Sequence, residues 1–259
     1  MQILKEKYVS KYKQALSFDL SKKWKEFNQE SAHRAEPDFE YLMEASAVYS
    51  SNIEGNPMDL NSFMNSKLRG VEATQQTKEF QEIVDLKQAY GFAQSNTLSE
   101  ENLLQSHKIL SKLFVSKGNQ GRYRQDSVGV YSSQGLVYLA VEANKVPEEM
   151  KKLFDDINYL LQEKMSVAEI FYWASFIHLQ IELIHPFVDG NGRVGRLAEK
   201  WFLSQKLGKT VWLLESEKYY KENIKNYYQN INLGVNYYES DYDQALPFLL
   251  MLPEALKND

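Results

Sequence analysis

HPFVDGNGRVGR, residues His185 to Arg196, is the stretch from which the fold and the site can be worked out. After Gly192 the apolar residues recur at the spacing of a helix with one buried face, and Gly208 is placed to end that helix. The GNG segment therefore lies at a helix N-terminus, where unpaired backbone N–H groups without bulky side chains let phosphate oxygens approach. Arg193 and Arg196 are three residues apart, so their guanidinium groups are close enough to hold the same phosphates. The stretch predicts a polyphosphate site.

Two other residues of this stretch have side chains suited to chemistry. A carboxylate just before the glycines would repel a bare phosphate, so Asp189 fits best as a ligand of Mg²⁺, or Mn²⁺, shared with the phosphates. His185 is held by the rigid Pro186 and is the natural general base. Phe187 is expected to anchor the loop in the core, which is the usual place for a phenylalanine.

The same glycines permit a second interpretation, a dinucleotide-binding loop. GNGRVG, from Gly190 to Gly195, matches the pattern G-x-G-x-x-G, and Glu215 ends the strand-like segment TVWLLE. That pattern requires a buried strand before the glycines, whereas IHPFVD contains a proline and two ionisable residues and follows a long helical pattern. The rest of the chain lacks the alternation of strands and helices that such a fold needs. Dinucleotide binding is therefore a distant alternative.

Composition narrows the classes of protein that remain. The chain has 259 residues, 43% hydrophobic content and no cysteine, which is enough for a real core and excludes disulfides and thiol nucleophiles. Its net charge of -5 argues against a general nucleic-acid binder or a binder of anionic membranes. The first residues lack a signal-type apolar core, and the apolar runs look too short to span a bilayer, so we expect a cytoplasmic protein.

Periodicity predicts a mainly helical, all-α fold with one small β-hairpin. The hairpin is expected at about 127–140, where SVGVY and GLVYLAV flank Ser133, Gln134 and Gly135. Apolar spacing predicts helices, with Ser99 and Pro147 in two of the first turns, over 39–54, 77–94, 99–114, 147–164 and 167–184. We expect an N-terminal helical segment, 1–36, packed on a main domain, 37–259.

HPFVDGNGRVGR matches the Fic motif HPFx(D/E)GNGRxxR at every position, so the chain resembles Fic-domain adenylyltransferases of the Fido superfamily. The similarity extends beyond the motif. GRYRQDSVGV resembles the segment that enters the Fic flap hairpin, IHLQIELIHPF resembles the helix leading to the motif, and IKNYYQNI is similar to a later tyrosine pair of the family. The resemblance covers about Phe39 to Leu252 and implies the helical Fic fold with its flap.

The resemblance implies transfer of AMP from ATP to a Ser, Thr or Tyr hydroxyl of a target protein that docks along the flap. His185 would deprotonate that hydroxyl, and Asp189 would hold Mg²⁺. The nucleotide's phosphates would be bound by Gly190, Asn191, Gly192, Arg193 and Arg196, with Arg193 on the β-phosphate side and Arg196 on the γ-phosphate. Gly192 favours AMP transfer, because the kinase-like Doc relatives carry lysine at that position.

A second short pattern lies near residue 50. Ser50, Glu54 and Gly55 in SSNIEGN fit [ST]xxxE[GN], the inhibitory motif of Fic proteins. A carboxylate in the last turn of a helix is disfavoured by the helix dipole, so Glu54 calls for a cationic partner. The resemblance implies that this partner is Arg196 and that the helix at 39–54 makes the protein an autoinhibited adenylyltransferase. Some relatives with such a helix remove AMP, so a de-AMPylase or a bifunctional enzyme is the alternative.

The nucleoside end of the site is less well defined by the sequence. Tyr227 and Tyr228 are candidate adenosine contacts, and either Asn232 or Asn236 could contact the nucleoside. A homodimer that buries the inhibitory helix also stays open. A binding-only adaptor that uses the fold without catalysis is a further alternative, but it would not need His185.

The remaining titratable residues in helical patterns are expected to serve the scaffold. His33, His107 and His178 are interpreted as structural histidines, and Glu182 as a hydrogen-bonding residue of its helix.

Overall fold

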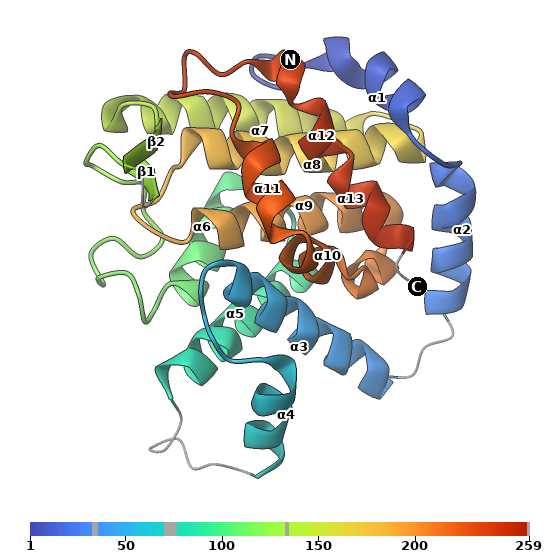
Figure 1. The fold of residues 1–259 in the computed structure, drawn as a ribbon, viewed down its shortest axis with the longest axis vertical. Helices are drawn as coiled ribbons and strands as arrows, with labels where there is room; N and C mark the ends of the chain where they lie inside the picture. Colours follow the sequence, from blue (N-terminus) through green and yellow to red (C-terminus); the bar gives the residue numbers. More distant parts are fainter. Residues whose placement is uncertain (33–35, 70–76, 133–134, 258–259) are drawn as a thin grey trace.

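The structure is a computed structural model that describes residues 1–32, 36–69, 77–132 and 135–257. In this part of the chain helices predominate, and they pack in layers around α8 and α9 (Figure 1). The described sheet has two strands. The all-α fold class with a small hairpin is therefore confirmed.

The helices and strands follow one another along the chain as α1 (Val9–Ala15), α2 (Leu20–Ser31), α3 (Glu36–Ile53), α4 (Leu60–Leu68), α5 (Lys78–Ser95), α6 (Glu100–Leu110), β1 (Gly129–Ser132), β2 (Gly135–Leu139), α7 (Val146–Gln162), α8 (Val167–Ile184), α9 (Asn191–Leu207), α10 (Ser216–Glu222), α11 (Ile224–Ile231), α12 (Leu246–Leu249) and α13 (Met251–Glu254). Ser99 caps α6, and Pro147 lies in the first turn of α7, as the sequence predicts.

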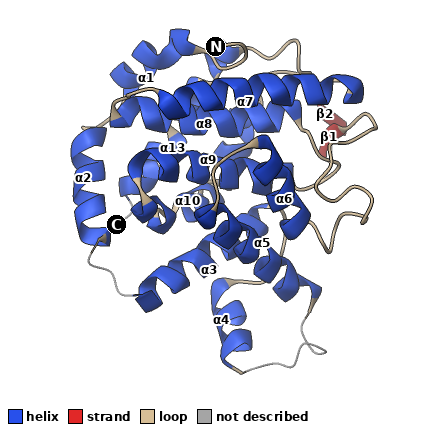
Figure 2. Cartoon of the chain, turned by 180° about the vertical axis from the view of Figure 1, so that it is seen from behind, coloured by secondary structure: helices blue, strands red, loops and turns tan. Residues whose placement is uncertain are grey.

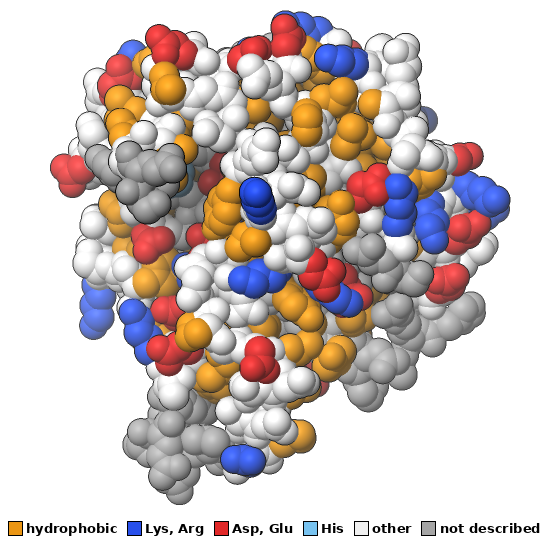
Figure 3. All heavy atoms as spheres, in the orientation of Figure 1, with side chains coloured by type: hydrophobic (Ala, Val, Ile, Leu, Met, Phe, Trp, Pro, Cys, Tyr) orange, Lys and Arg blue, Asp and Glu red, His pale blue; other side chains and the backbone are white. Residues whose placement is uncertain are grey.

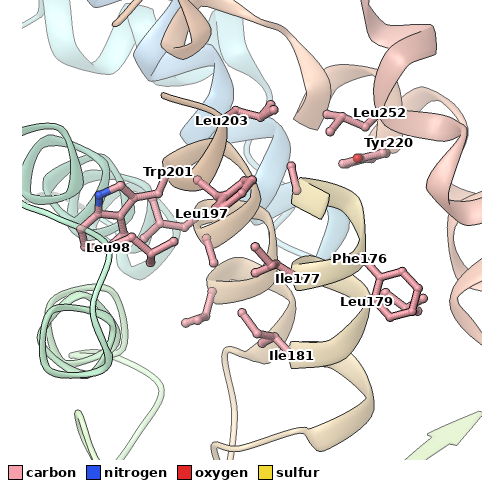
Figure 4. Close-up of a cluster of buried hydrophobic side chains, with 14 of the residues drawn as sticks. Leu98, Phe176, Ile177, Leu179, Ile181, Leu197, Trp201, Leu203, Tyr220 and Leu252 are labelled. Carbon is pink, nitrogen blue, oxygen red and sulfur yellow. The ribbon is translucent and has the colours of Figure 1, made fainter. Parts of the chain in front are cut away.

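Helices α8 and α9 form the centre of the fold. Their facing apolar side chains pack together, and Figure 4 shows Ile177 and Ile181 of α8 beside Leu197 of α9. A capping box at Ser166 starts α8, since the serine and Glu169 satisfy each other's backbone N–H groups. Only the residues of the Fic motif join the two helices. The candidate site is thus built on the most deeply buried pair of elements.

Helix α8 is long and apolar enough to cross a membrane by length and composition, contrary to the expectation that no apolar run reaches that length. In this structure 78% of its apolar window is buried inside the protein. A helix that is apolar all round is also what the centre of a large helical domain requires.

Helix α3 is attached to the core by buried charges along its length. Glu44, 1% exposed, pairs with Lys67 of α4 at 2.7 Å and with Lys87 of α5 at 2.5 Å. Two residues further on, Ser46 accepts a hydrogen bond of 3.0 Å from the buried ammonium group of Lys200 on α9. The middle of α3 is thereby held against the middle of α9.

The hairpin lies at the edge of the helical body (Figure 2). Its strands β1 and β2 are antiparallel, with an irregularity between Val130 and Tyr131. The outer edge of β2 is already paired, because Leu139 exchanges backbone hydrogen bonds with Val235 and Tyr237. The predicted turn residues 133 and 134 lie outside the described residues.

The N-terminal segment packs against α7 and α8. The Asp156 carboxylate accepts hydrogen bonds of 2.7, 2.8 and 2.9 Å from the backbone N–H groups of Gln2, Ile3 and Leu4. Three such bonds to one carboxylate hold the beginning of the chain on α7. The domain boundary at residue 36 stays a prediction.

The dinucleotide interpretation is wrong. TVWLLE, which was expected to be strand-like, contains most of a 3₁₀ helix, Lys209–Leu213, and the segment before Gly190 follows a helix, α8, instead of a strand. A short apolar run looks alike in a buried strand and in a buried helical turn, which explains the error.

Acidic and basic side chains are interspersed on the face drawn in Figure 3, without a continuous basic field. This face therefore lacks the basic patch or stripe that is typical of a nucleic-acid-binding surface.

Candidate active site

The Fic motif forms a tight loop and the first turn of α9. Gly190 caps the helix with a φ of 89°, a conformation that favours glycine, and α9 begins at Asn191. A Cβ atom on Gly192 would lie 2.2 Å from the Glu54 carboxylate oxygen and 3.1 Å from the Arg196 guanidinium. The absence of side chains therefore leaves a cradle at the helix N-terminus, and Glu54 lies in it.

The loop that carries this cradle is rigidly held. Phe187 is fully buried and stacks on His107 with a centroid distance of 3.8 Å. The Asn191 amide bridges the backbone of Phe187, donating to its carbonyl at 2.9 Å and accepting from its N–H at 2.8 Å. Asn191 thus contributes its side chain to the loop, and only its backbone faces the place where phosphates would bind.

His107 is a structural histidine, as expected, and it supports the same loop. It accepts a hydrogen bond from the Gly121 N–H at 3.0 Å and donates one to the Asp189 carbonyl at 3.0 Å. Burial lowers the pKa of His107 to about 4, so the ring is neutral at neutral pH. The neutral ring can therefore keep both bonds.

His185 ends α8 in a left-handed conformation, with φ 51° and ψ 61°. A non-glycine residue rarely adopts this conformation, which costs on the order of 1 to 2 kcal/mol. The buried Arg124 compensates through its guanidinium, which donates to the carbonyls of His185 at 2.7 Å and Ile184 at 3.3 Å. The backbone N–H of Arg124 donates to Pro186 at 2.9 Å. Arg124 holds the loop in its strained form.

Hydrogen bonding and burial also set the state of the His185 ring. Its Nδ1 lies 3.3 Å from the backbone carbonyl of Glu182, which can only accept, so Nδ1 carries the hydrogen. The lone pair is then on Nε2. Burial is the main cause that lowers the pKa of His185 to about 4, so the imidazole is neutral and able to accept a proton.

Arg196 is fully buried and held by four hydrogen bonds. It donates to the Glu54 carboxylate at 2.7 Å, to the hydroxyl and carbonyl of Ser50 at 2.9 and 3.0 Å, and to the Tyr227 hydroxyl at 3.1 Å. The structure therefore brings together the two arms of the predicted inhibitory pair, 142 residues apart in the chain. We call the Glu54–Arg196 ion pair the latch.

The latch is electrostatically stable. Burial raises the pKa of Glu54, but the charges of Arg196 and Arg193 outweigh burial, and the pKa lies below its usual value. Gly55 follows with a φ of 92°, which turns the chain away as α3 ends. Glu54 therefore lies just beyond the helix, one residue outside the predicted last turn, and is ionised at neutral pH.

Arg193 faces the same cradle from another side. Its guanidinium lies 4.3 Å from the centre of the Phe114 ring and 3.6 Å from the carboxylate of Glu82 on α5. The two arginines are thus paired with different acids, Arg193 with Glu82 and Arg196 with Glu54. A ligand with several phosphate oxygens would have to replace both acids to reach both arginines.

A pocket of about 90 Å³ opens beside His185. It is lined by Tyr228 and Asn232 near the end of α11, and by Val130 and Tyr138 of the hairpin. Asn236, the other candidate, bonds instead to Glu239.

The other predicted tyrosine has a different place. Tyr227 is 2% exposed and lies beneath Arg196, where its hydroxyl also contacts the Nε2 atom of His178 at 3.0 Å. His178 in turn contacts Glu199 at 3.0 Å, so both of its ring nitrogens are satisfied, as expected of a structural histidine. His33 lies outside the described residues.

Asp189 lies at the mouth of the cradle with its side chain exposed, and one carboxylate oxygen accepts the Gly190 N–H at 2.6 Å. Among the described residues no group of three acids or histidines could hold a metal alone. A single carboxylate fits Mg²⁺ only when phosphate oxygens supply further ligands, as Mg²⁺ commonly prefers.

Three supporting residues have no separate signal in the sequence: Arg124, Glu82 and Lys200. Arg124 lies in a stretch that suggests only the entrance to the hairpin, and Glu82 and Lys200 lie within amphipathic helical patterns. They contact residues far away in the chain, and these contacts exist only in the folded protein.

The chain is similar to proteins of one known family. Residues 97–203 match the model of the Fic/DOC family. The protein adenylyltransferase Fic of Nematostella vectensis is 27% identical over 158 residues, which cover 58% of this chain and 35% of that protein. The protein adenylyltransferase fic-1 of Caenorhabditis elegans is 24% identical over 189 residues, covering 64% and 35% respectively. The chain spans about a third of the length of these curated relatives.

Solved structures show the same fold. A Fic family protein from Desulfovibrio desulfuricans G20 superposes with a TM-score of 0.76 at 23% identity, covering 92% of this chain and 71% of that one. Fic-1 from C. elegans gives a TM-score of 0.64 at 19% identity, with coverages of 92% and 68%. The family match and the motif show a Fic domain over residues 97–203, and the solved structures show that the described residues share the fold of Fic proteins.

Proposed function

We propose that this protein is an adenylyltransferase that moves AMP from ATP to a hydroxyl group of a target protein. The observation that carries the proposal is the arrangement within one loop. A neutral histidine with a free Nε2 lone pair lies next to a helix N-terminus that is flanked by Arg193 and Arg196. The names of the curated relatives support the same reaction.

The reaction balances with these groups alone. The target hydroxyl gives its proton to Nε2 of His185 while its oxygen forms a bond to the α-phosphorus of ATP. The bond between that phosphorus and the oxygen bridging to the β-phosphate breaks, and pyrophosphate leaves. The N–H groups at the start of α9, with Arg193, would stabilise the charge that develops on the leaving phosphates.

Asp189 would hold Mg²⁺ together with the phosphates, and the ion would neutralise phosphate charge. Arg196 would bind the γ-phosphate, but only after it exchanges the Glu54 carboxylate for it. The latch therefore supports a resting state of low activity, in which the γ-phosphate of ATP has to compete with the Glu54 carboxylate for Arg196.

The target is proposed to dock along β1. The outer edge of β2 is already paired with the loop that follows α11, and β1 forms the other edge of the sheet. Val130 of β1 is 38% exposed and also lines the pocket beside His185. An extended segment paired with β1 would bring a hydroxyl to the same pocket.

A labelling experiment tests the reaction. Wild type, Glu54→Ala and Glu54→Ala/His185→Ala are incubated with Mg²⁺, a lysate and ATP labelled at either the α- or the γ-phosphate. We expect protein labelling from the α-position only, stronger in Glu54→Ala and lost with His185→Ala. Transfer of γ-label would show a kinase instead, and no α-label from Glu54→Ala would contradict the proposal.

Removal of AMP is a second candidate, because Glu54 lies at the cradle with 26% of its side chain exposed. A carboxylate there could orient a water molecule toward the phosphorus of a modified target. Lysate proteins labelled by Glu54→Ala provide the substrate for this test. Release of labelled AMP by wild type, but not by Glu54→Ala, would support removal.

A further inference from the structure

Glu182 is a buried acid that the proposed reaction does not use. It lies in the last turn of α8, three residues before His185, and its side chain is 16% exposed. The Oε1 atom is buried without any hydrogen-bond partner. The expectation that Glu182 is a hydrogen-bonding residue of the scaffold is therefore wrong. An unpaired buried oxygen is costly, and one beside a reactive group calls for a functional explanation.

The second carboxyl oxygen of Glu182 faces the base. Its Oε2 lies 4.0 Å from Nδ1 of His185, the nitrogen that also contacts the Glu182 backbone carbonyl. The backbone carbonyl of Glu182 is within hydrogen-bond distance of this N–H, and its carboxyl oxygen lies just beyond that distance. The backbone carbonyl of Glu182 keeps the hydrogen of the His185 ring on Nδ1. The carboxyl group is close enough to move toward Nδ1 when positive charge develops on the ring.

Such charge has to develop during catalysis. When Nε2 takes the proton of a hydroxyl, the ring becomes a cation in a site whose burial disfavours cations, as the lowered pKa of His185 indicates. A carboxylate on the opposite nitrogen offsets this penalty and keeps the ring oriented, which is the role of the acid in a Ser-His-Asp triad.

We propose that Glu182 is the partner carboxyl group of His185, a positioning residue that holds the Nδ1–H and stabilises the imidazolium formed when the hydroxyl is deprotonated. The inference rests on the proposed function, because only deprotonation of a hydroxyl creates that charge. The proton taken from the hydroxyl stays on Nε2, and the Nδ1 proton stays on the ring.

The neighbours of Glu182 connect this role to the latch. Burial, and then the charge of Glu54, raise the pKa of Glu182 to about 8, while Arg196 lowers it. With the latch closed, Glu182 is protonated at neutral pH and cannot stabilise a cation. Removal of the Glu54 charge makes ionisation of Glu182 easier. The closed latch would therefore lower the activity of the base, His185, as well as block the phosphate site. The titratable and charged groups around Glu182 are His185, Glu54 at the end of α3, Tyr138 of β2, Arg196 of α9, and Tyr227 and Tyr228 of α11.

The first readout does not depend on activity. The chain has four histidines, so ¹³C-labelled histidine gives few signals, and His185→Ala identifies the relevant one. In wild type we expect the His185 signal to shift near pH 8, because Glu182 ionises 4.0 Å away. Glu182→Gln should lose this step. Glu169→Gln, the same change in the first turn of α8, should keep it. A His185 signal that does not shift near pH 8 in wild type would overturn the inference, even if Glu182→Gln failed to fold.

The second readout is kinetic, in the Glu54→Ala background. We expect Glu182→Gln to lower kcat for transfer of α-label about 10- to 100-fold and to remove the rise of kcat with pH, with KM for ATP nearly unchanged. Equal kcat and pH profiles in both proteins would overturn it. If Glu54→Ala itself transfers no label, the proposed function fails, whereas the histidine titration still decides whether Glu182 and His185 are coupled.

Discussion

Replacing Glu54 by alanine should tighten ATP binding by an amount that the geometry of the latch sets. Two unit charges 2.7 Å apart attract by about 6 kcal/mol at an effective dielectric constant near 20. Desolvation of Arg196, which is fully buried, and the 26% exposure of Glu54 offset most of this attraction, leaving about 2 kcal/mol. At 1.36 kcal/mol for each factor of ten, ATP should bind about 30-fold more tightly.

Isothermal titration with Mg²⁺ and ATP measures this change directly. Glu215→Ala is a matched control, because the Glu215 side chain is 25% exposed and paired with Lys218 at 3.4 Å, away from both phosphate-site arginines. Its affinity should equal that of wild type. Because Glu54→Ala leaves Arg196 without its anion, this variant should also melt at a lower temperature until ATP is added. An affinity within about threefold of wild type would refute the competition between Glu54 and the γ-phosphate.

Three further predictions concern the surroundings of the latch. Because the folded pKa of Glu182 is raised from 4.5 to about 8, the folded state binds more protons than the unfolded state between these values, and stability falls as pH rises through them. Between pH 6.5 and 8, urea unfolding should show that the free energy of unfolding of wild type falls relative to that of Glu182→Gln, by at most about 1.4 kcal/mol per pH unit. An equal dependence on pH in the two proteins would contradict this prediction. Arg124→Ala should lower the free energy of unfolding in urea by about 3 kcal/mol and lower kcat at least tenfold, because the strained backbone of His185 loses its support. Normal AMP transfer by a destabilised Arg124→Ala variant would refute the role of Arg124 in holding His185. Gly192→Ala places a Cβ atom 2.2 Å from Glu54. It should therefore lower the free energy of unfolding by about 1 to 3 kcal/mol in wild type but by much less in Glu54→Ala. Equal losses in the two backgrounds would show that the two residues do not collide.

The parts of the site that the sequence predicts are those in which neighbours in the chain are neighbours in space. His185, the cradle and Arg196 belong to one loop and the first two turns of α9, so a contiguous motif and helical spacing suffice to place them. The latch joins residues 142 positions apart, and the sequence points to it only through a second short pattern and a helix-end carboxylate that needs a cation.

The parts of the site that the sequence does not predict depend on packing between elements that are distant in the chain. Arg124 acts on backbone carbonyl groups, which every residue has, so no sequence pattern marks its partners. Glu182 was expected to be satisfied because buried acids usually are, and only the folded structure shows an oxygen without a partner. The hairpin and the long helices were predicted because their periodicity is local, whereas the short run TVWLLE has no periodicity that decides between strand and helix.

Under the proposed function, Glu54 is an inhibitor that the chain itself carries, so its concentration at the site is fixed by geometry. A group tethered in the same chain competes at an effective concentration that does not depend on the amount of protein in the cell. Dilution would not release it, and the ATP level that displaces Glu54 from Arg196 would depend on how firmly α3 is attached to the core. Bonds remote from the proposed nucleotide site, such as that of Lys200 to Ser46, would therefore help to set the ATP level at which the latch opens.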